Sequence, residues 1–169
     1  MTSPASAVPV RILGVDPGTR LAGYAVVEVR AAGVLTYVEC GTLKVDPRRE
    51  LNARLLELSE ALAEVITEFH PAMMAIESAY TGVSAQSALK LSEARGAFKV
   101  VAMRSGLDVF EYAPGRIKRA VVGKGRATKA EVQRRVATLC ALTKAPAADA
   151  ADALAIALCH AFSLRSPRP

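Results

Sequence analysis

The sequence has little of several features that define particular protein classes. Its 169 residues contain no tryptophan, only two histidines and only three cysteines. The odd number of cysteines (Cys40, Cys140 and Cys159) and their spacing exclude a zinc ribbon and a complete disulfide framework. Cys140 and Cys159 fall within helical apolar patterns, so we expect buried free thiols and a reducing, cytoplasmic setting.

Long apolar segments are also missing. No run approaches the roughly 20 apolar residues that cross a bilayer, so we expect no membrane association. The opening stretch, MTSPASAVPV, lacks the basic and apolar regions of a signal peptide, and we expect a disordered tail over residues 1–9. A hydrophobic fraction of 51% with 22% charged residues is typical of a globular fold. The length predicts one domain over residues 10–164, followed by a short tail at 165–169.

Positive charge is concentrated in one segment. The whole chain has a formal charge of +6, whereas residues 114–135 alone carry eight basic residues and one acid, which gives +7 and leaves −1 for the rest. Local basicity of this kind is typical of a surface that binds a polyanion, although a solvated basic face gives the same pattern. The basic residues are Arg116, Lys118, Arg119, Lys124, Arg126, Lys129, Arg134 and Arg135.

The order of apolar patterns predicts an α/β fold with a five-stranded mixed sheet flanked by helices. Strands at 10–16, 22–30 and 34–45, joined by short turns, indicate an antiparallel meander. The next predicted element is a helix capped by Asp46 and begun by Pro47. A strand at 72–78, a helix at 84–104 and a strand at 107–113 follow. After a flexible loop at VVGKGRA, the pattern predicts a helix opened by the Thr128–Glu131 capping box and a last helix at 146–163. His70 is expected to cap the end of the first helix.

Four acids lie in apolar surroundings. Asp16 and Glu77 each end a strand that is expected to be buried, and a carboxylate buried alone is very costly. Asp149 and Asp152 lie three residues apart in APAADAADALAIAL, so they share one helix face and repel each other unless a cation lies between them. Taken singly, Asp16 also fits an Asx turn or a phosphate-binding turn, and Asp149 also fits the first turn of a helix.

Together the four acids form an all-oxygen ligand set suited to Mg²⁺, for which Mn²⁺ can substitute. Two such ions about 4 Å apart can activate water and stabilise the leaving oxygen of a phosphodiester. Histidine is not part of this set, because His160 lies eight residues beyond Asp152, roughly 12 Å along the helix. With a basic surface nearby, the residues predict metal-dependent hydrolysis of nucleic acid.

Five stretches occur in the order of a known family: LGVDPGTRLAGYAV, AIESAY, SALKLSEARG, IKRAVVGKGRATKAEVQ and DAADALAIALCHA. From about Arg11 to Phe162 the chain closely resembles the RuvC-type Holliday junction resolvases. The resemblance implies a ribonuclease H-like fold with an antiparallel second strand. It also implies a homodimer that nicks two opposing strands of a four-way DNA junction and works with the RuvA–RuvB branch-migration complex.

The same resemblance assigns roles to individual residues. Asp16, Glu77, Asp149 and Asp152 match the catalytic, metal-binding acids of the family. Tyr80 matches an aromatic that reaches into the junction, and an exposed ring after Glu77 can stack on an unpaired base, although a packing role for it stays open. We assign DNA binding to Tyr80, Arg116, Lys118, Lys124, Arg126 and Lys129.

Two other functions and one assembly feature complete the expectations. A YqgF-like nuclease that processes structured RNA shares this fold, and a non-catalytic junction-binding module would share the basic surface. The helix at 84–103 carries small and apolar residues at Leu89, Gly96, Val100 and Met103, which indicates a seam for the partner helix of a homodimer.

Overall fold

One mixed β-sheet forms the centre of the protein in the computed structural model, which describes residues 8–30, 33–78 and 84–165. The strand order is β3-β2-β1-β4-β5. β2 is antiparallel to β1 and β3, whereas β1, β4 and β5 run parallel to one another, so the predicted mixed sheet with an antiparallel second strand is confirmed. The strands are β1 (Val10–Asp16), β2 (Leu21–Val29), β3 (Leu35–Lys44), β4 (Met73–Glu77) and β5 (Asp108–Tyr112).

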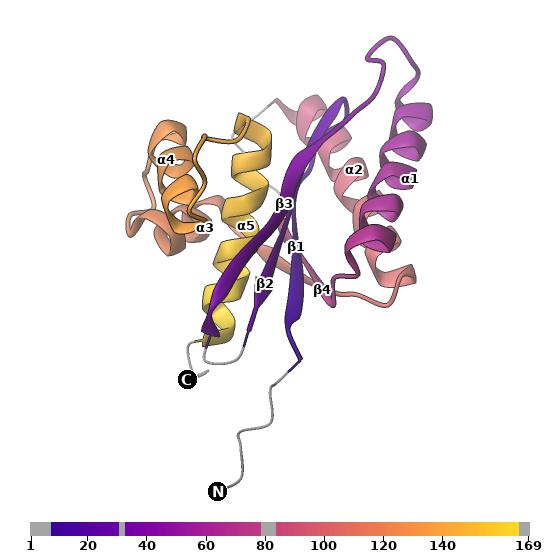
Figure 1. The fold of residues 1–169 in the computed structure, drawn as a ribbon. Coiled ribbons are helices and arrows are strands. Elements are labelled where there is room, and N and C mark those ends of the chain that lie inside the picture. Colours follow the sequence, from indigo (N-terminus) through magenta and orange to yellow (C-terminus); the bar gives the residue numbers. More distant parts are fainter. Residues whose placement is uncertain (1–7, 31–32, 79–83, 166–169) are drawn as a thin grey trace, which may run out of the picture.

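Helices cover both faces of the sheet (Figure 1). α1 (Leu51–Phe69) and α2 (Ala85–Arg104) pack on one face, around a core that includes Leu13, Leu58 and Phe98. α3 (Pro114–Val122), α4 (Lys129–Leu139) and α5 (Ala148–Arg165) pack on the other. No helix within the described ranges is long and apolar enough to cross a membrane.

Local capping signals act at the ends of three helices, and two of them, the Thr128–Glu131 box and His70, were predicted. The Thr128 hydroxyl accepts from the Glu131 N–H while the Glu131 carboxylate accepts from the Thr128 N–H, so the capping box that opens α4 is confirmed. Ser84 caps α2 through the Ser87 N–H. His70 ends α1 in the left-handed conformation, with φ 49°, and its N–H donates to the Ile66 carbonyl at 3.0 Å.

The expected start of the first helix is wrong. Asp46 does not cap α1, which begins at Leu51 after a turn. The Asp46 carboxylate instead accepts from the Arg48 N–H at 3.0 Å and pairs with the Arg48 guanidinium. A short acid followed by proline serves an Asx turn as well as it serves a helix cap, and here the local turn is formed.

Three other expectations need correction. The region between β5 and the VVGKGRA segment forms α3, a helix that we did not predict, with Pro114 at its start; Val121 and Val122 belong to it, and the loop begins only at Gly123. α5 begins at Ala148 rather than Pro146 and ends at Arg165. All three cysteines are free, but only Cys159 is buried, and Cys140 lies half-buried at the end of α4.

Two glycines let α5 lie directly on the sheet. A Cβ on Gly14 of β1 would be 2.2 Å from the Ala153 carbonyl oxygen, and one on Gly23 of β2 would be 2.0 Å from the Asp149 carbonyl oxygen. Real Cβ atoms do not tolerate such distances, so side chains at these points would push the helix away. The glycines therefore set how closely the acids of α5 approach the ends of the strands.

Candidate active site

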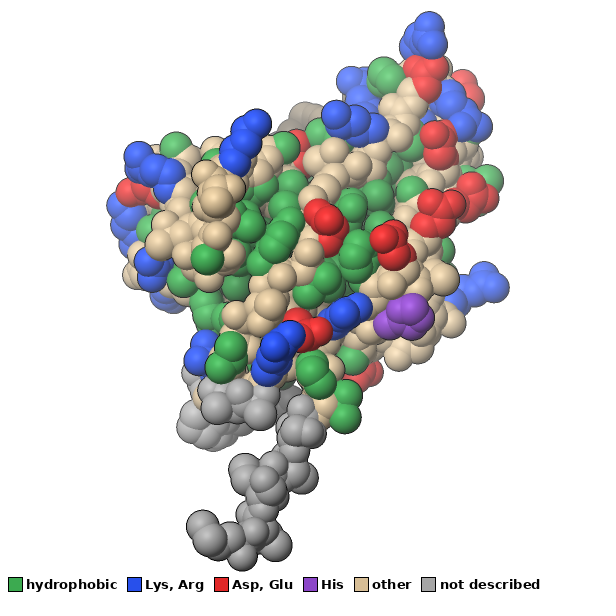
Figure 2. Space-filling view, viewed as in Figure 1, with side chains coloured by type: hydrophobic (Ala, Val, Ile, Leu, Met, Phe, Trp, Pro, Cys, Tyr) green, Lys and Arg blue, Asp and Glu red, His purple; other side chains and the backbone are tan. Residues whose placement is uncertain are grey.

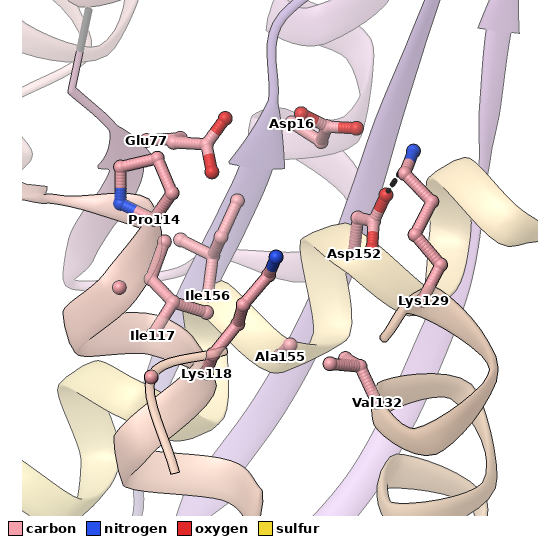
Figure 3. Close-up of a pocket in the computed structure, with 12 residues that line it drawn as sticks. Asp16, Glu77, Pro114, Ile117, Lys118, Lys129, Val132, Asp152, Ala155 and Ile156 are labelled. Carbon is pink, nitrogen blue, oxygen red and sulfur yellow. Dashed lines mark hydrogen bonds and ion pairs between the residues drawn. The ribbon is translucent and has the colours of Figure 1, made fainter. Parts of the chain in front are cut away.

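A cleft of about 500 Å³ opens at the carboxyl ends of β1 and β4, between the sheet, α3, α4 and α5 (Figure 3). Three acids and two lysines line it: Asp16, Glu77, Asp152, Lys118 and Lys129. The remaining lining is small or apolar and is contributed largely by the facing sides of the three helices: Pro114, Gly115, Ile117, Gly125, Val132, Ala155 and Ile156.

The ends of two parallel strands place Asp16 and Glu77 at this cleft. The pairing of β1 with β4 ends at Val15 and Ile76, one residue before each acid. The carboxyl edge of a parallel sheet is where ligands commonly bind in open α/β folds. Both acids therefore lie where the strands separate, next to buried residues of the strands but open to the cleft on one side.

α5 contributes the other two acids. Asp149 lies in its first turn and Asp152 one turn later, and the close contact at Gly23 holds this end of the helix against β2. Gly23 is also the register partner of Asp16. Asp152 lines the cleft beside Asp16, whereas Asp149 is not among the lining residues but is near enough for its charge to act on Asp16.

The electrostatics of the site disfavour so much negative charge. Burial raises the pKa of Asp16 to about 7, and the charges of Asp152, Glu77 and Asp149 act in the same direction. Burial, followed by the charge of Asp152, also raises the pKa of Glu77. Burying several acids side by side does not stabilise the fold, because each carboxylate disfavours ionisation of its neighbours. The arrangement favours binding of a cation.

Two lysines supply part of the missing positive charge. Lys129, in the first turn of α4, donates to the Asp152 carboxylate at 3.2 Å, and this carboxylate raises the Lys129 pKa. Lys118 extends from α3 into the cleft toward Glu77 (Figure 3), and its charge opposes the rise in the Glu77 pKa. Both lysines therefore lie beside the acids rather than on a remote surface.

The donor set fits a hard divalent cation in chemistry, since every candidate ligand is a carboxylate oxygen. The carboxylates are not drawn together in advance: within the described part of the chain, no three histidine, cysteine or acidic side chains are gathered closely enough to enclose an ion. Asp152 is engaged by Lys129, whose side chain is 79% exposed and can move. An ion bound through the same Asp152 oxygen, Oδ2, would compete with this ion pair.

The other basic residues of the predicted interface have mixed surroundings. The Arg116 guanidinium lies over the Tyr112 ring, 4.9 Å from its centroid. Lys124 pairs with Glu131 of the capping box, and Arg126 is exposed in the loop between α3 and α4. Tyr80 lies outside the described residues, so its predicted role stays a prediction.

One functional contact was missed by the sequence reasoning. Arg95 of α2 donates from Nε to the backbone carbonyl of Glu77 at 2.9 Å. The sequence does show an arginine in the stretch SALKLSEARG, a stretch that supports the family resemblance as a whole. Nothing in that stretch indicates which strand the arginine would reach.

Comparisons with known proteins agree with this geometry. The family model described as "Crossover junction endodeoxyribonuclease RuvC" matches residues 12–160. A protein of that name from Geobacter metallireducens is 45% identical over 154 residues, covering 91% of this chain and 93% of its own. One from Sodalis glossinidius is 48% identical over 151 residues, covering 88% and 85%.

Solved structures extend the match to three dimensions. RuvC from Thermus thermophilus superposes with a TM-score of 0.83 at 34% identity, covering 92% of this chain and 96% of the other. The same protein in complex with a Holliday junction substrate gives a TM-score of 0.85 at 34% identity, covering 92% and 95%. The yeast mitochondrial Holliday junction resolvase Ydc2 shares the fold, with a TM-score of 0.63 at 11% identity, covering 90% and 79%. With a ribonuclease H-like sheet, acids at its carboxyl edge and relatives matched over nearly their whole length, this chain belongs to the RuvC family of crossover junction endodeoxyribonucleases.

Proposed function

We propose that this protein resolves four-way DNA junctions by nicking two opposing strands, with Asp16, Glu77, Asp149 and Asp152 as its catalytic acids. The observation that carries the proposal is the concentration of these acids around one cleft, where the pKa of Asp16 is raised to about 7. The Thermus thermophilus relative, whose structure holds a Holliday junction, supports the choice of substrate.

The same four carboxylates would hold the metal, which we propose to be Mg²⁺ with Mn²⁺ as a substitute, at two ions per site. When bound, the ions supply charge that activates water and stabilises the leaving oxygen of the phosphodiester. The protein's own groups orient the phosphate: Lys118 and Lys129 lie on the two sides of the cleft, where they can pair with phosphate oxygens. The apolar floor formed by Ile117, Val132 and Ile156 limits the access of water from below.

DNA binding extends from the cleft over α3, α4 and the loop between them. We assign phosphate contacts to Arg116, Lys124 and Arg126 in addition to the two lysines of the cleft. The exposed positions of Arg116 and Arg126 support this assignment. Tyr80, three residues beyond Glu77, is proposed to stack on a base at the crossover.

We propose that the protein acts as a homodimer through α2. Leu89, Val100 and Met103 on this helix are 68%, 55% and 65% exposed, respectively, and no atom of another element in the described part of the chain lies within 4 Å of where a Cβ on Gly96 would be. A two-fold dimer presents two active sites, which suits the near two-fold symmetry of a four-way junction. Cooperation with the RuvA–RuvB complex and a cytoplasmic location, which three free thiols favour, belong to the same proposal.

A direct assay tests the activity. The protein is incubated with a synthetic four-way DNA junction, linear duplex DNA or hairpin RNA, in Mg²⁺, Mn²⁺ or EDTA. We expect paired nicks in the junction with either metal and none in EDTA. Preferential cutting of the hairpin RNA would support the YqgF-like alternative, and junction binding without any cutting would support a non-catalytic binding module.

A further inference from the structure

Arg95 connects α2 to the end of the strand that carries Glu77. Its Nε donates to the Glu77 carbonyl at 2.9 Å, and its guanidinium also pairs with the carboxylate of Glu111 on β5. The Arg95 side chain is only 12% exposed, although it starts from a helix on the surface of the molecule. An arginine that is largely buried and bound on two sides is held in one orientation.

Glu77 occupies a position where the sheet alone gives little support. The pairing of β4 with β1 has already ended at Ile76, so Glu77 keeps register only with Tyr112 of β5. The next residue, Ser78, donates to the Tyr112 carbonyl at 2.9 Å. The contact from Arg95 is thus an additional hold on Glu77 itself, from a helix outside the sheet.

Glu111 holds the Arg95 guanidinium in place. Its carboxylate binds both Arg95 and Lys99, which lies one turn further along α2. Lys99 therefore shares the anchor but has no contact with Glu77 among the described hydrogen bonds. Substitution of Lys99 is therefore a control, because it removes a cation bound to Glu111 but keeps the contact between Arg95 and Glu77.

We propose that Arg95 is a positioning residue for Glu77, which fixes the strand end so that the Glu77 carboxylate can meet the other acids at the cleft. The proposal rests on the proposed function, in which Glu77 is a metal ligand. Arg95 is not itself among the residues that line the cleft; it contacts the backbone of Glu77, which is. Because no three acids of the described chain are gathered in advance, correct placement of each strand end decides whether they can converge.

The test compares Arg95→Met with Lys99→Met in the full-length protein. We measure the single-turnover cleavage rate at saturating junction, the junction Kd, and Mn²⁺ binding to the DNA-free protein by electron paramagnetic resonance. For Arg95→Met we expect a rate at least tenfold lower, Mn²⁺ binding at least fivefold weaker, and a junction Kd within twofold of the wild type. For Lys99→Met we expect all three within twofold.

Arg95→Lys keeps the positive charge and tests the positioning role if Arg95→Met does not fold. A lysine can reach one of the two partners but cannot bridge them, so its cleavage rate should fall at least threefold while its melting temperature stays near the wild-type value. A normal rate and normal Mn²⁺ binding in Arg95→Met, or equal losses in Lys99→Met, would overturn the proposal. Wild type and Glu77→Gln run in parallel: if the wild type does not cut or Glu77→Gln cuts normally, the assignment of the site has failed instead.

Discussion

The two faces of the sheet are built differently. On one face α5 rests on Gly14 and Gly23, so that backbone meets backbone, and this helix carries Asp149 and Asp152. On the other face α1 and α2 stand off on large side chains such as Leu58, Leu62 and Phe98. The first face fixes the position of the α5 acids, whereas the second mainly completes the core, apart from Arg95, which reaches Glu77. Close backbone contact thus accompanies the chemistry, and ordinary side-chain packing accompanies the rest.

The surface charge follows the same division. Eight basic residues and one acid lie on α3, on α4 and in the loop between them, while α1 presents a stripe of acids at Glu57, Glu60, Glu64 and Glu68 (Figure 2). A polyanion such as DNA is attracted to the basic segment and repelled by the acidic stripe of α1. The comparison of the two faces therefore predicts where substitutions affect catalysis and where they affect stability or assembly, with Arg95 of α2 as the exception because it reaches the end of β4.

The largest effect is expected from the acids of the cleft. Asp16→Asn or Glu77→Gln should reduce junction cleavage by at least about 1000-fold, roughly 4 kcal/mol, because the charge that the metal site needs is lost. Junction binding should persist, since the basic surface supplies most of the affinity. Single-turnover cleavage and gel-shift titration measure the two quantities. Near-normal nicking by either variant in ordinary Mg²⁺ would remove these acids from the mechanism.

Adding one methyl group to each face separates the two modes of packing. Gly14→Ala should lower the free energy of unfolding by about 3 kcal/mol or more and slow cleavage, because the new Cβ would overlap the Ala153 carbonyl. Gly96→Ala on α2, where no described atom of another element lies within 4 Å in the single chain, should be neutral or stabilise the monomer by up to about 1 kcal/mol. Urea denaturation compares them, and a Gly14→Ala protein as stable as the wild type would show that α5 is not seated as closely as described.

Dimerisation should depend on the second face. Leu89→Glu with Met103→Glu should raise the dimer Kd at least about 100-fold, because each substitution replaces an apolar side chain, worth about 1.5–3 kcal/mol when buried, by a charge. Leu56→Glu on α1, at a leucine that is 61% exposed, is the matched control and should leave the dimer intact. Sedimentation velocity at micromolar concentration decides. Full paired nicking by a strictly monomeric wild type would refute the dimer.

We expect His160 and Asp16 to change the stability of the fold in opposite directions as pH falls. Burial lowers the pKa of His160 to about 4. The stability that the neutral His160 ring contributes is therefore fully present above pH 6.5 and is lost as pH falls toward 4. The pKa of Asp16 is raised to about 7, so protonation stabilises the folded state as pH falls from 7 toward 4. Each group contributes a slope of at most about 1.4 kcal/mol per pH unit, with opposite sign.

Two variants separate these contributions in EDTA. Relative to the wild type, Asp16→Asn should lose stability on acidification from pH 7 to 4.5, because the titration of His160 is no longer opposed. His160→Leu should gain stability over the same range, since Asp16 still titrates. Chemical denaturation at four pH values measures both. Parallel curves for the two variants would contradict the environments described for these groups.

The smallest effects concern the lysines of the cleft. Lys118→Ala and Lys129→Ala should each weaken junction binding modestly and reduce the slope of log affinity against log salt by about 0.9, the value for one phosphate contact. Lys144→Ala, outside the basic segment, serves as the control. An unchanged slope for either cleft lysine would mean that it does not touch the DNA backbone.

Most of the elements could be predicted because their signals are local. Short apolar runs predicted β1 and β2, alternation predicted β3, and the Thr128–Glu131 box predicted the start of α4, since these patterns act over a few neighbouring residues. The prediction failed where one signal serves two structures. Asp46-Pro47 formed a turn instead of a helix start, and α3 was missed because its nine residues, with Gly115 near their start, gave too short a pattern.

The sequence by itself determined the chemical character of the site: acids in apolar surroundings at Asp16, Glu77, Asp149 and Asp152, and a concentrated basic segment. A buried charge is so costly that its presence in an apolar run is informative without any coordinates. Only the tertiary structure decided which groups meet. That Lys129 engages Asp152, that Gly23 admits the end of α5, and that Arg95 holds the carbonyl of Glu77 all depend on contacts between segments distant in the chain. Such contacts are set by how whole elements pack, and no local pattern of residues encodes them.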